Sequence, residues 1–344
     1  MQERKIRTAV IGLGRMGELH SRIYNELPLS RLVAVVDIDF DKAKRIARQC
    51  KCKAYKDYKN ILDKVDTVTI STPTCSHHSI ACDFIRYNIP VLIEKPLAAT
   101  VKEGREVVNL AQRNNVLVAV GHSERCNPIY LSVKGMDIQP IFIEATRINP
   151  YSFRTTDIGV ILDLMIHDID VVLSMVKSPV KKVDAIGANI LNQKEDICYA
   201  RIFFRNGCMA SLSASRLALK SSRKIQIFSK TAYLSMDYSK KRGIVIRSDE
   251  NINLLKWIRD QDNLINLDPL SFNWRQLLKI EELNVDDIEP LRLEQESFLR
   301  SVIFKDSEPQ VTGEEGLKAL SCAYRIIHSL KIHSFVYDFN KADT

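Results

Sequence analysis

The sequence has no long apolar run. No stretch approaches the roughly 18 or more apolar residues that a membrane-spanning helix requires. The first five residues, Met-Gln-Glu-Arg-Lys, lead directly into a short segment typical of a strand and do not form a signal peptide. The sequence therefore predicts a protein that does not associate with a membrane, and we expect it in the cytoplasm.

Paired cysteines are also missing. The chain of 344 residues has 8 cysteines, and none of them forms a CxxC pair or a spacing typical of zinc sites. Cys75 and Cys82 do lie near His77 and His78, so a metal site there is one alternative. A buried thiol beside a cofactor loop explains the same residues, and we expect free thiols and no metal.

A basic stretch interleaved with aromatic residues, as nucleic-acid binding proteins have, is absent as well. The net charge is +8, but Lys and Arg are scattered among Asp and Glu. This pattern excludes nucleic acid as the expected partner and favours mild attraction of an anionic substrate. With 45% hydrophobic and 27% charged residues, the composition is that of a soluble globular protein, and the length predicts two domains.

Residues 5–121 alternate short β-branched runs with helical patterns, which is typical of a doubly wound parallel sheet. Six strands fit a Rossmann domain, which we place at residues 1–121. Thr100 followed by Glu103 predicts a capping box at the start of the helix before the sixth strand. The predicted strands are Arg7–Ile11, Leu32–Asp37, Lys53–Tyr55, Thr67–Ser71, Val91–Glu94 and Val116–Gly121.

Residues 122–344 follow another pattern and are assigned to a second domain of the α+β class. An apolar helix is predicted over Ile158–Val176, and strand segments then follow one another, which favours an open antiparallel sheet. Residues 249–290 show no clear period and are interpreted as an irregular excursion. The predicted strands are Ile141–Ile148, Lys182–Leu191, Cys198–Phe204, Met209–Arg216, Lys224–Phe228, Tyr233–Tyr238 and Gly243–Arg247, and the closing helices are Leu291–Ile303 and Glu314–Leu330.

A glycine-rich turn follows the first predicted strand. In Gly12-Leu13-Gly14-Arg15-Met16-Gly17, the first glycine permits the tight turn and the second lets the backbone approach a diphosphate. Gly17 allows the helix to pack closely on the sheet. We therefore predict that this segment binds a dinucleotide at the helix N-terminus; a tight turn without a cofactor is the alternative.

Asp37 ends the second predicted strand, 20 residues after Gly17. A carboxylate at this place accepts hydrogen bonds from the ribose hydroxyls of the adenosine half and repels a 2'-phosphate. The expected cofactor is therefore NAD and not NADP.

Strands four and five end at the same edge of the predicted sheet, where ligands bind. The segment with Thr72, Pro73 and His77 follows strand four, so its hydroxyls can line the cofactor, although Thr72-Pro73 also suits a plain rigid turn. Strand five ends in Glu94-Lys95-Pro96, further toward the nicotinamide. A lysine there can hydrogen-bond a substrate hydroxyl and stabilise a forming alkoxide.

The apolar helix of the second domain carries Asp163, His167 and Asp170 at positions i, i+4 and i+7. This spacing predicts that the three side chains share one face. A carboxylate one turn from a histidine can orient it and raise its basicity, as a general base requires. A buried polar pair without chemistry is the alternative.

Several segments together resemble the glucose-fructose oxidoreductase and inositol dehydrogenase family, Gfo/Idh/MocA. The resemblance implies that Lys95 and His167 are the catalytic pair, that Asp163 is their partner, and that the site lies at the junction of the two domains. It also implies a homodimer or homotetramer formed through the outer face of the second sheet. The matching segments are Gly12–Gly17, Thr72–Thr74 with His77, Glu94–Pro96, Gly121–His122, Asn127–Pro128, Asp163 with His167, Glu289–Leu291 and Gly313–Leu317.

Within that family, Gly121–Pro128 and Arg154–Asp170 look most like UDP-N-acetylglucosamine 3-dehydrogenases, which prepare 3-amino sugars, including those of lipid A. The resemblance implies oxidation of C3 of a nucleotide sugar. Arginine suits a diphosphate through bidentate hydrogen bonds, although each candidate could instead be a surface residue or an ion-pair partner. Oxidation of a free sugar or inositol is one alternative, and a non-catalytic NAD-bound sensor is another. The candidate substrate residues are Lys95, Arg125, Asn127, Arg147, Arg154, Asp163 and His167.

Overall fold

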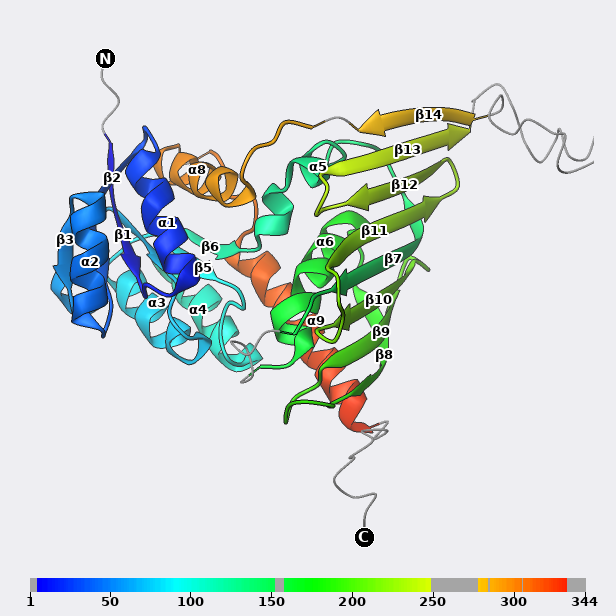
Figure 1. The fold of residues 1–344 in the computed structure, drawn as a ribbon, viewed down its shortest axis with the longest axis horizontal. Helices are drawn as coiled ribbons and strands as arrows, with labels where there is room; N and C mark the ends of the chain where they lie inside the picture. Colours follow the sequence, from blue (N-terminus) through cyan, green and yellow to red (C-terminus); the bar gives the residue numbers. More distant parts are fainter. Residues whose placement is uncertain (1–4, 152–157, 249–277, 284, 305, 333–344) are drawn as a thin grey trace, which may run out of the picture.

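The computed structural model describes residues 5–151, 158–248, 278–283, 285–304 and 306–332. The chain forms two sheets that lie side by side, each with helices packed against it (Figure 1). No helix in the described ranges is long and apolar enough to span a membrane.

The first sheet has six parallel strands in the order β3-β2-β1-β4-β5-β6. This order is that of a Rossmann fold, as the alternating pattern predicted. It brings the ends of β1 and β4 to the point where the strand order reverses. The strands are β1 (Ile6–Ile11), β2 (Ser30–Val36), β3 (Lys53–Tyr55), β4 (Thr67–Ile70), β5 (Val91–Glu94) and β6 (Val118–Gly121).

Helices cover both faces of this sheet. One buried cluster joins the sheet to α1 and α2, and a second joins its other face to α3 and α4. The predicted capping box is present at the start of α4: Thr100 Oγ1 accepts from the Glu103 amide at 3.2 Å, and the Glu103 carboxylate accepts from the Thr100 amide at 3.0 Å. The helices are α1 (Arg15–Glu26), α2 (Phe40–Cys50), α3 (His77–Arg86) and α4 (Val101–Asn114), with short 3-10 turns at Tyr58–Ile61 and Thr74–Ser76.

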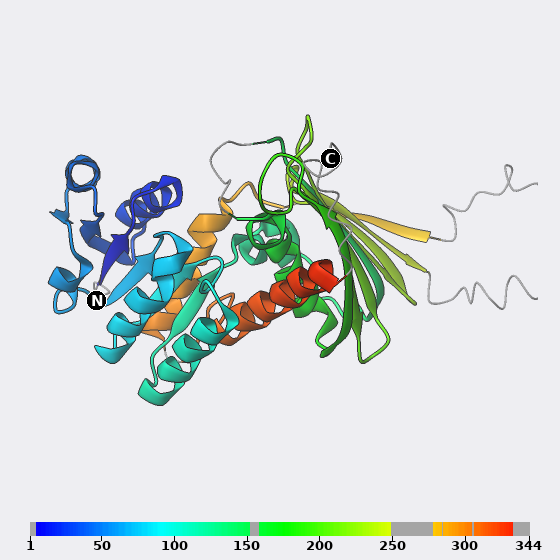
Figure 2. The same ribbon diagram turned by 90° about the horizontal axis from the view of Figure 1, so that it is seen from below.

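The second sheet has eight strands in the order β14-β13-β12-β11-β7-β10-β9-β8. All neighbouring pairs are antiparallel except β7 and β10, which run parallel. Seen from below, the sheet is curved and its inner face carries helices (Figure 2). The strands are β7 (Pro140–Ile148), β8 (Val180–Ala188), β9 (Ile197–Phe204), β10 (Met209–Ser215), β11 (Ser222–Ser229), β12 (Ala232–Asp237), β13 (Arg242–Ser248) and β14 (Leu278–Leu283).

The irregular excursion predicted for residues 249–290 is wrong over six of its described residues. Leu278–Leu283 forms the edge strand β14, which pairs with β13 along its whole length. Its sequence, Leu-Lys-Ile-Glu-Glu-Leu, breaks strict alternation at the two glutamates, so the strand signal is weak. The part of the excursion at residues 249–277 lies outside the described residues.

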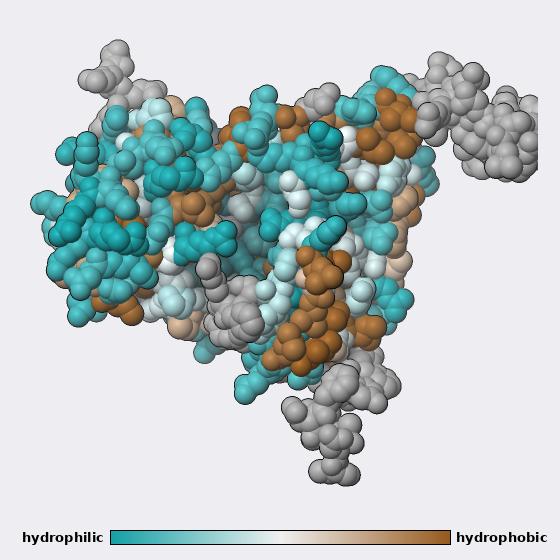
Figure 3. Space-filling model, viewed as in Figure 1, coloured by the Kyte–Doolittle hydropathy of each residue, from teal (hydrophilic) through white to brown (hydrophobic). Residues whose placement is uncertain are grey.

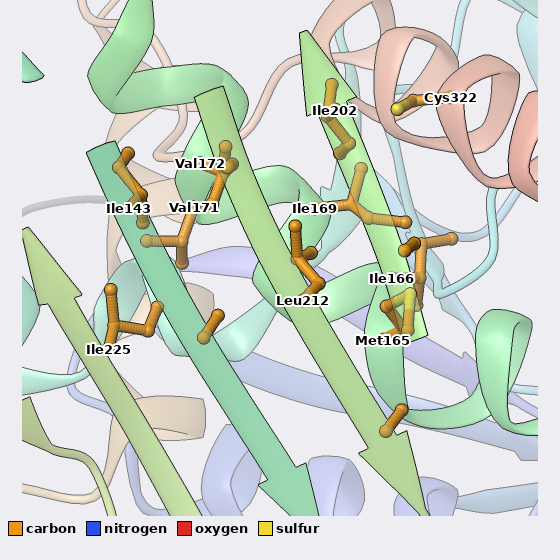
Figure 4. Close-up of a cluster of buried hydrophobic side chains, with 14 of the residues drawn as sticks. Ile143, Met165, Ile166, Ile169, Val171, Val172, Ile202, Leu212, Ile225 and Cys322 are labelled. Atoms are coloured by element: carbon orange, nitrogen blue, oxygen red, sulfur yellow. The ribbon is translucent and has the colours of Figure 1, made fainter. Parts of the chain in front are cut away.

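The inner face of the second sheet packs against α6 (Ile166–Val176), and Figure 4 shows their shared apolar core. Isoleucine and valine side chains of α6 point to residues of β7, β9, β10 and β11, and Cys322 of α9 lies beside them. The predicted single helix over Ile158–Val176 differs in one respect: Ile161–Met165 forms a π-helical turn before α6 begins.

Two C-terminal helices join the two parts of the chain. α8 (Pro290–Ile303) packs back on the Rossmann part, where Arg22 pairs with Glu289 at 2.9 Å and Arg292 with Glu26 at 3.1 Å. α9 (Gly313–Ile332) contacts α4 and β6 on one side and α6 and β8 on the other. Both helices belong to the proposed second domain, residues 122–344, and both contact the Rossmann part.

Candidate active site

The glycine-rich turn has the geometry that a dinucleotide requires. Gly12 has a φ of +83°, and a Cβ built on it would lie 2.6 Å from the Ser71 carbonyl oxygen. A Cβ on Gly17 would lie 1.9 Å from the Gly12 oxygen, so the helix passes directly over the turn. A Cβ on Gly14 would meet no atom within 4 Å. The backbone at Gly14 is thus open at the N-terminus of α1, where a diphosphate can accept amide hydrogens.

Asp37 lies against this turn. Its carboxylate accepts hydrogen bonds from the Leu13 amide at 2.7 Å and the Asp39 amide at 2.9 Å. These bonds hold the carboxylate at the end of β2, where an adenosine ribose would bind. Arg15 and Met16, the first residues of α1, are exposed beside it. The residues present therefore fit NAD.

His77 does not face an open site. It is 1% exposed, and its two ring nitrogens lie 2.9 Å from the Thr72 carbonyl oxygen and 3.0 Å from the Pro96 carbonyl oxygen. The ring connects the loops that follow β4 and β5, and its burial lowers its pKa. Thr72 and Pro73 remain partly open to the cleft. His77 therefore holds together the two loops that follow β4 and β5, and it does so from inside the protein.

Glu94 is buried at the end of β5. Its carboxylate lies 2.9 Å from Nε2 of His20 and accepts from the Lys95 amide at 3.2 Å. The other nitrogen of His20 meets Gln295 of α8 at 2.7 Å. Burial acts to raise the pKa of Glu94, but the contact with His20 outweighs it and the pKa is lowered. Glu94 thus holds the backbone that carries Lys95.

The two parts of the chain meet at Lys95 and Asp163. Lys95 Nζ donates to the Asp163 carboxylate at 3.1 Å and to the Asp163 carbonyl oxygen at 2.7 Å. Both side chains are 19% exposed. The pair is therefore partly accessible to solvent, so a substrate hydroxyl can reach the lysine.

His167 lies four residues further along the chain. It is half-buried, and its Nδ1 has no hydrogen-bond partner among the described residues. Burial, then the positive charges of Lys95 and Arg147, hold its pKa well below the usual range. The imidazole is therefore neutral at physiological pH and able to accept a proton.

Asp163 does not orient His167 in the way the spacing predicted. Its carboxylate is engaged with Lys95, and the neighbour of the His167 ring is His122, with ring centroids 6.0 Å apart and planes nearly perpendicular. His122 is fully buried, and both its ring nitrogens lack partners in the described structure. Burial lowers its pKa to about 3.

The start of the helix is fixed by Glu195. Its carbonyl oxygen accepts from the Val160 amide at 3.0 Å, and its carboxylate accepts from the Ile161 amide at 3.3 Å. A Cβ on Gly159 would lie 1.9 Å from the same carboxylate, so glycine is required there. Glu195 thereby satisfies amides that the turn leaves free.

A buried ion cluster behind the site was not predicted. Arg147 donates to Asp168 at 3.0 and 2.8 Å and to Glu124 at 2.8 Å, and all three side chains are at most 8% exposed. Arg147, a candidate for binding diphosphate, is therefore occupied by the protein itself. The alternation of β7 was the available signal, because it puts Arg147 on the inner face with Ile143.

The other predicted substrate residues are also internal or lie elsewhere. Arg125 is 5% exposed and pairs with Glu315 at 2.9 Å and with Asp170 at 3.5 Å. Asp170 thus turns away from Asp163 and His167. Asn127 is buried; it caps the short helix α5 (Pro128–Leu131) and donates to Glu124 at 3.2 Å. Arg154 lies outside the described residues.

Arg223 was missed in the sequence. It lies opposite Arg147 in the register of β11 and β7, on the inner face, and its side chain is 42% exposed. It approaches Glu124 at 3.8 Å, its Nε has no partner in the described ranges, and its charge helps to lower the pKa of His167. Arg223 is therefore an accessible cation close to the base. Figure 3 shows hydrophilic residues around the hollow between the two parts of the molecule.

Within the described residues, no group of three or more His, Cys, Asp or Glu side chains is arranged to hold a metal ion. A dinucleotide site, a partly exposed lysine and a neutral histidine define an NAD-dependent dehydrogenase.

The chain belongs to the GFO/IDH/MocA oxidoreductase family. Residues 6–122 match the family's NAD-binding Rossmann domain and residues 143–235 its C-terminal domain. The protein is an NAD-dependent sugar dehydrogenase of that family.

Similar proteins include two dehydrogenases with different named substrates. UDP-N-acetylglucosamine 3-dehydrogenase of Acidithiobacillus ferrooxidans is 34% identical over 235 residues, 68% of this chain and 74% of that protein. The scyllo-inositol 2-dehydrogenase (NAD(+)) of Bacillus subtilis is 27% identical, over 62% and 68%.

Solved structures agree on the fold. The structure of the Acidithiobacillus ferrooxidans enzyme superposes with a TM-score of 0.84 at 27% identity, covering 96% of this chain and 98% of the other. Levoglucosan dehydrogenase, in complex with NADH and levoglucosan, has a TM-score of 0.80 at 17% identity and covers 96% and 98%. At that identity the second likeness concerns the fold alone.

Proposed function

We propose that the protein oxidises a nucleotide sugar, and specifically C3 of UDP-N-acetylglucosamine to the 3-keto sugar. The observation that carries the chemistry is the convergence of the Lys95–Asp163 pair with the neutral His167 at the carboxyl edge of the Rossmann sheet. Bound NAD supplies the hydride acceptor, so the sugar carbon loses a hydride and its hydroxyl loses a proton.

The protein's own groups manage the proton and the charge. His167 takes the hydroxyl proton, because burial keeps the imidazole neutral before the reaction. Lys95 donates a hydrogen bond to the hydroxyl oxygen and stabilises the negative charge that forms there. Asp163 holds the ammonium group of Lys95 in position through the 3.1 Å contact.

The substrate assignment has two supports. The first is similarity to an enzyme named for UDP-N-acetylglucosamine, at 34% identity. The second is Arg223, a partly exposed guanidinium beside His167 that suits the diphosphate of a nucleotide sugar. Similarity to inositol dehydrogenases keeps a free polyol as the second candidate. The three polar groups of the catalytic cluster argue against a sensor without turnover.

The experiment follows NADH absorbance with UDP-N-acetylglucosamine, free N-acetylglucosamine and myo-inositol. We expect the nucleotide sugar to be oxidised fastest, since contacts to the diphosphate orient the reacting hydroxyl. Reduction of NAD at the same rate with a free sugar or inositol would overturn the assignment. Arg223→Ala should raise the KM for the nucleotide sugar more than that for a free sugar.

The proposal includes self-association through the outer face of the second sheet, as a dimer or tetramer. Large apolar side chains on this face are 39% to 60% exposed, which suits burial against another copy. They are Ile186, Tyr199, Phe228 and Ile280. Sedimentation of the wild type and of Tyr199→Lys tests this; a monomeric wild type would refute it.

A further inference from the structure

A second cavity lies apart from the cleft, along α6 and α9. Its volume is about 820 Å³, and it is bounded by the C-terminal half of α6, the start of β8, α5 and α9. Neither the candidate catalytic residues nor the cofactor residues line it. A cavity of this size accommodates a ligand as large as a nucleotide.

The walls of this cavity are strongly basic. Its described lining includes five cationic side chains and two carboxylates, Asp170 and Glu315. Arg125 lies at the buried end, whereas the other four cations are exposed at the rim. Those four are Lys134, Lys177, Lys318 and Arg325. The surplus of positive charge favours an anion.

The rim lysines are not all used by the protein. Lys134 donates to Gln310 at 2.7 Å, and Arg325 donates to backbone carbonyls at the start of β8 at 3.1 Å. The side-chain ammonium groups of Lys177 and Lys318 form no hydrogen bond or ion pair with any described residue. Both ammonium groups are therefore available to a ligand.

The buried end of the cavity holds polar atoms without partners. Arg125 uses its terminal nitrogens for Glu315 and Asp170, but its Nε is buried and unpartnered in the described structure. One oxygen of Asp170 is in the same state. A buried donor without an acceptor costs free energy, which an oxygen of a ligand would recover.

The rest of the lining is not charged. Leu173, Val180 and Leu317 provide apolar surface, and Tyr130 adds a ring whose hydroxyl meets Ser174 at 3.0 Å. A bare inorganic anion would leave this surface in contact with water. The lining therefore matches a molecule with a phosphate at one end and a carbon skeleton at the other.

We propose that this cavity binds an organic phosphate of nucleotide size and that the bound ligand acts on the active site. Arg125 belongs to the 3-10 turn Ser123–Cys126, which directly follows His122, and Asp170 is three residues beyond His167 on the same helix. A ligand that binds Arg125 and changes its contact with Asp170 would therefore shift the segments that carry His122 and His167.

The test uses UMP as the probe and calorimetry on the full chain saturated with NADH, so that the dinucleotide site is filled. The double variant Lys177→Gln/Lys318→Gln removes the two free charges at exposed positions. We expect it to weaken UMP binding by at least about tenfold, since hydrogen bonds to charged groups are the strong ones. Lys220→Gln, an exposed lysine away from the cavity, should change nothing.

Further arms separate this cavity from the cleft. Arg223→Ala should still bind UMP, and adding Lys177→Gln/Lys318→Gln to it should weaken that binding. UMP binding that is lost in Arg223→Ala and kept in the double variant would overturn the proposal, and so would no binding at millimolar UMP. Inorganic phosphate that binds as tightly as UMP would refute the role of the apolar wall.

A final arm tests the action on the active site. UMP should change the KM of whichever sugar is oxidised in the wild type, and this change should disappear in the double variant. An equal change in both proteins would refute the coupling. Because the binding arms need no turnover, they stand or fall independently of the proposed reaction.

Discussion

Two ion pairs at the junction of the molecule differ in their access to water. Lys95 and Asp163 face the cleft, each with 19% of its side chain exposed. Arg147 of β7 and Asp168, which lies in α6 just after the π-helical turn that carries Asp163, are each 3% exposed and joined by two short hydrogen bonds. The first pair can exchange partners with a substrate, whereas the second is closed to everything but the protein. Ion pairs of similar chemistry thus take part in the reaction at one place and stabilise the fold at the other.

The largest expected effect comes from removing one partner of the buried Arg147–Asp168 pair. Arg147→Met leaves Asp168 and Glu124 buried without their partner, which should lower the free energy of unfolding by about 3–5 kcal/mol. Urea denaturation measures this. As a control, Arg147→Met combined with Asp168→Leu should recover part of the loss, because fewer charges then remain uncompensated. An unchanged stability in the single variant would contradict the buried cluster.

Changes at Lys95, in the partly exposed pair, and at the neighbouring His167 should affect turnover instead of stability. Lys95→Met and His167→Asn should each lower kcat by roughly 100-fold or more, the scale of positioned acid-base groups, while NAD binding stays nearly intact. Steady-state rates and a cofactor titration check both parts. Variants that keep full activity would return these residues to a structural role.

His122 extends the comparison to pH. Its pKa is about 3 in the folded chain, below the value of about 6.5 expected when unfolded, so protonation favours unfolding. Stability from this group is complete above about pH 6.5 and falls by about 1.4 kcal/mol per unit as the pH decreases toward 3. Denaturation curves at several pH values give the free energy of unfolding as a function of pH. This free energy should fall less steeply with decreasing pH in His122→Gln than in the wild type. An equal dependence on pH in both proteins would mean that the folded chain does not hold His122 as a buried, neutral imidazole.

Asp163→Asn should be milder than the loss of Lys95 or His167. The amide still accepts a hydrogen bond from Lys95 but no longer balances its charge, so we expect kcat to fall by roughly tenfold. Unfolding should hardly change, since the pair is partly solvated. A loss of stability as large as that of Arg147→Met would erase the distinction between the two pairs.

The smallest expected effect lies at the other end of the cleft. Asp37 is bound by two backbone amides and has no cationic partner in the described structure, so its charge remains to repel a 2'-phosphate. NAD should bind more tightly than NADP, and Asp37→Ala should narrow the difference. Titration of both cofactors decides, and tighter binding of NADP to the wild type would contradict the prediction.

The Rossmann half was predictable because its signals are local. Gly12, Gly14 and Gly17 all lie in one turn, and the structure shows the close approaches that require glycine at positions 12 and 17. The second half was harder, because Arg147 and Arg125 find partners far away in the chain. Their charge suggested a ligand, and only the tertiary fold reveals that carboxylates of the protein already occupy them. Arg223 shows the converse, an unremarked strand residue that the fold brings beside His167.

The π-helical turn at Ile161–Met165 explains why Asp163 faces Lys95 while the helix that follows faces the core. A π turn contains one residue more than an α turn, and each residue of an α-helix advances the direction of its side chain by about 100°. The surplus residue changes the phase of Asp163 relative to all of α6. Its carboxylate points to Lys95, while the regular helix after it keeps Ile166 and Ile169 in the core. In evolutionary terms the turn is equivalent to a single-codon insertion, and deleting one residue there would restore an ordinary helix at the cost of the contact that joins the two parts of the site.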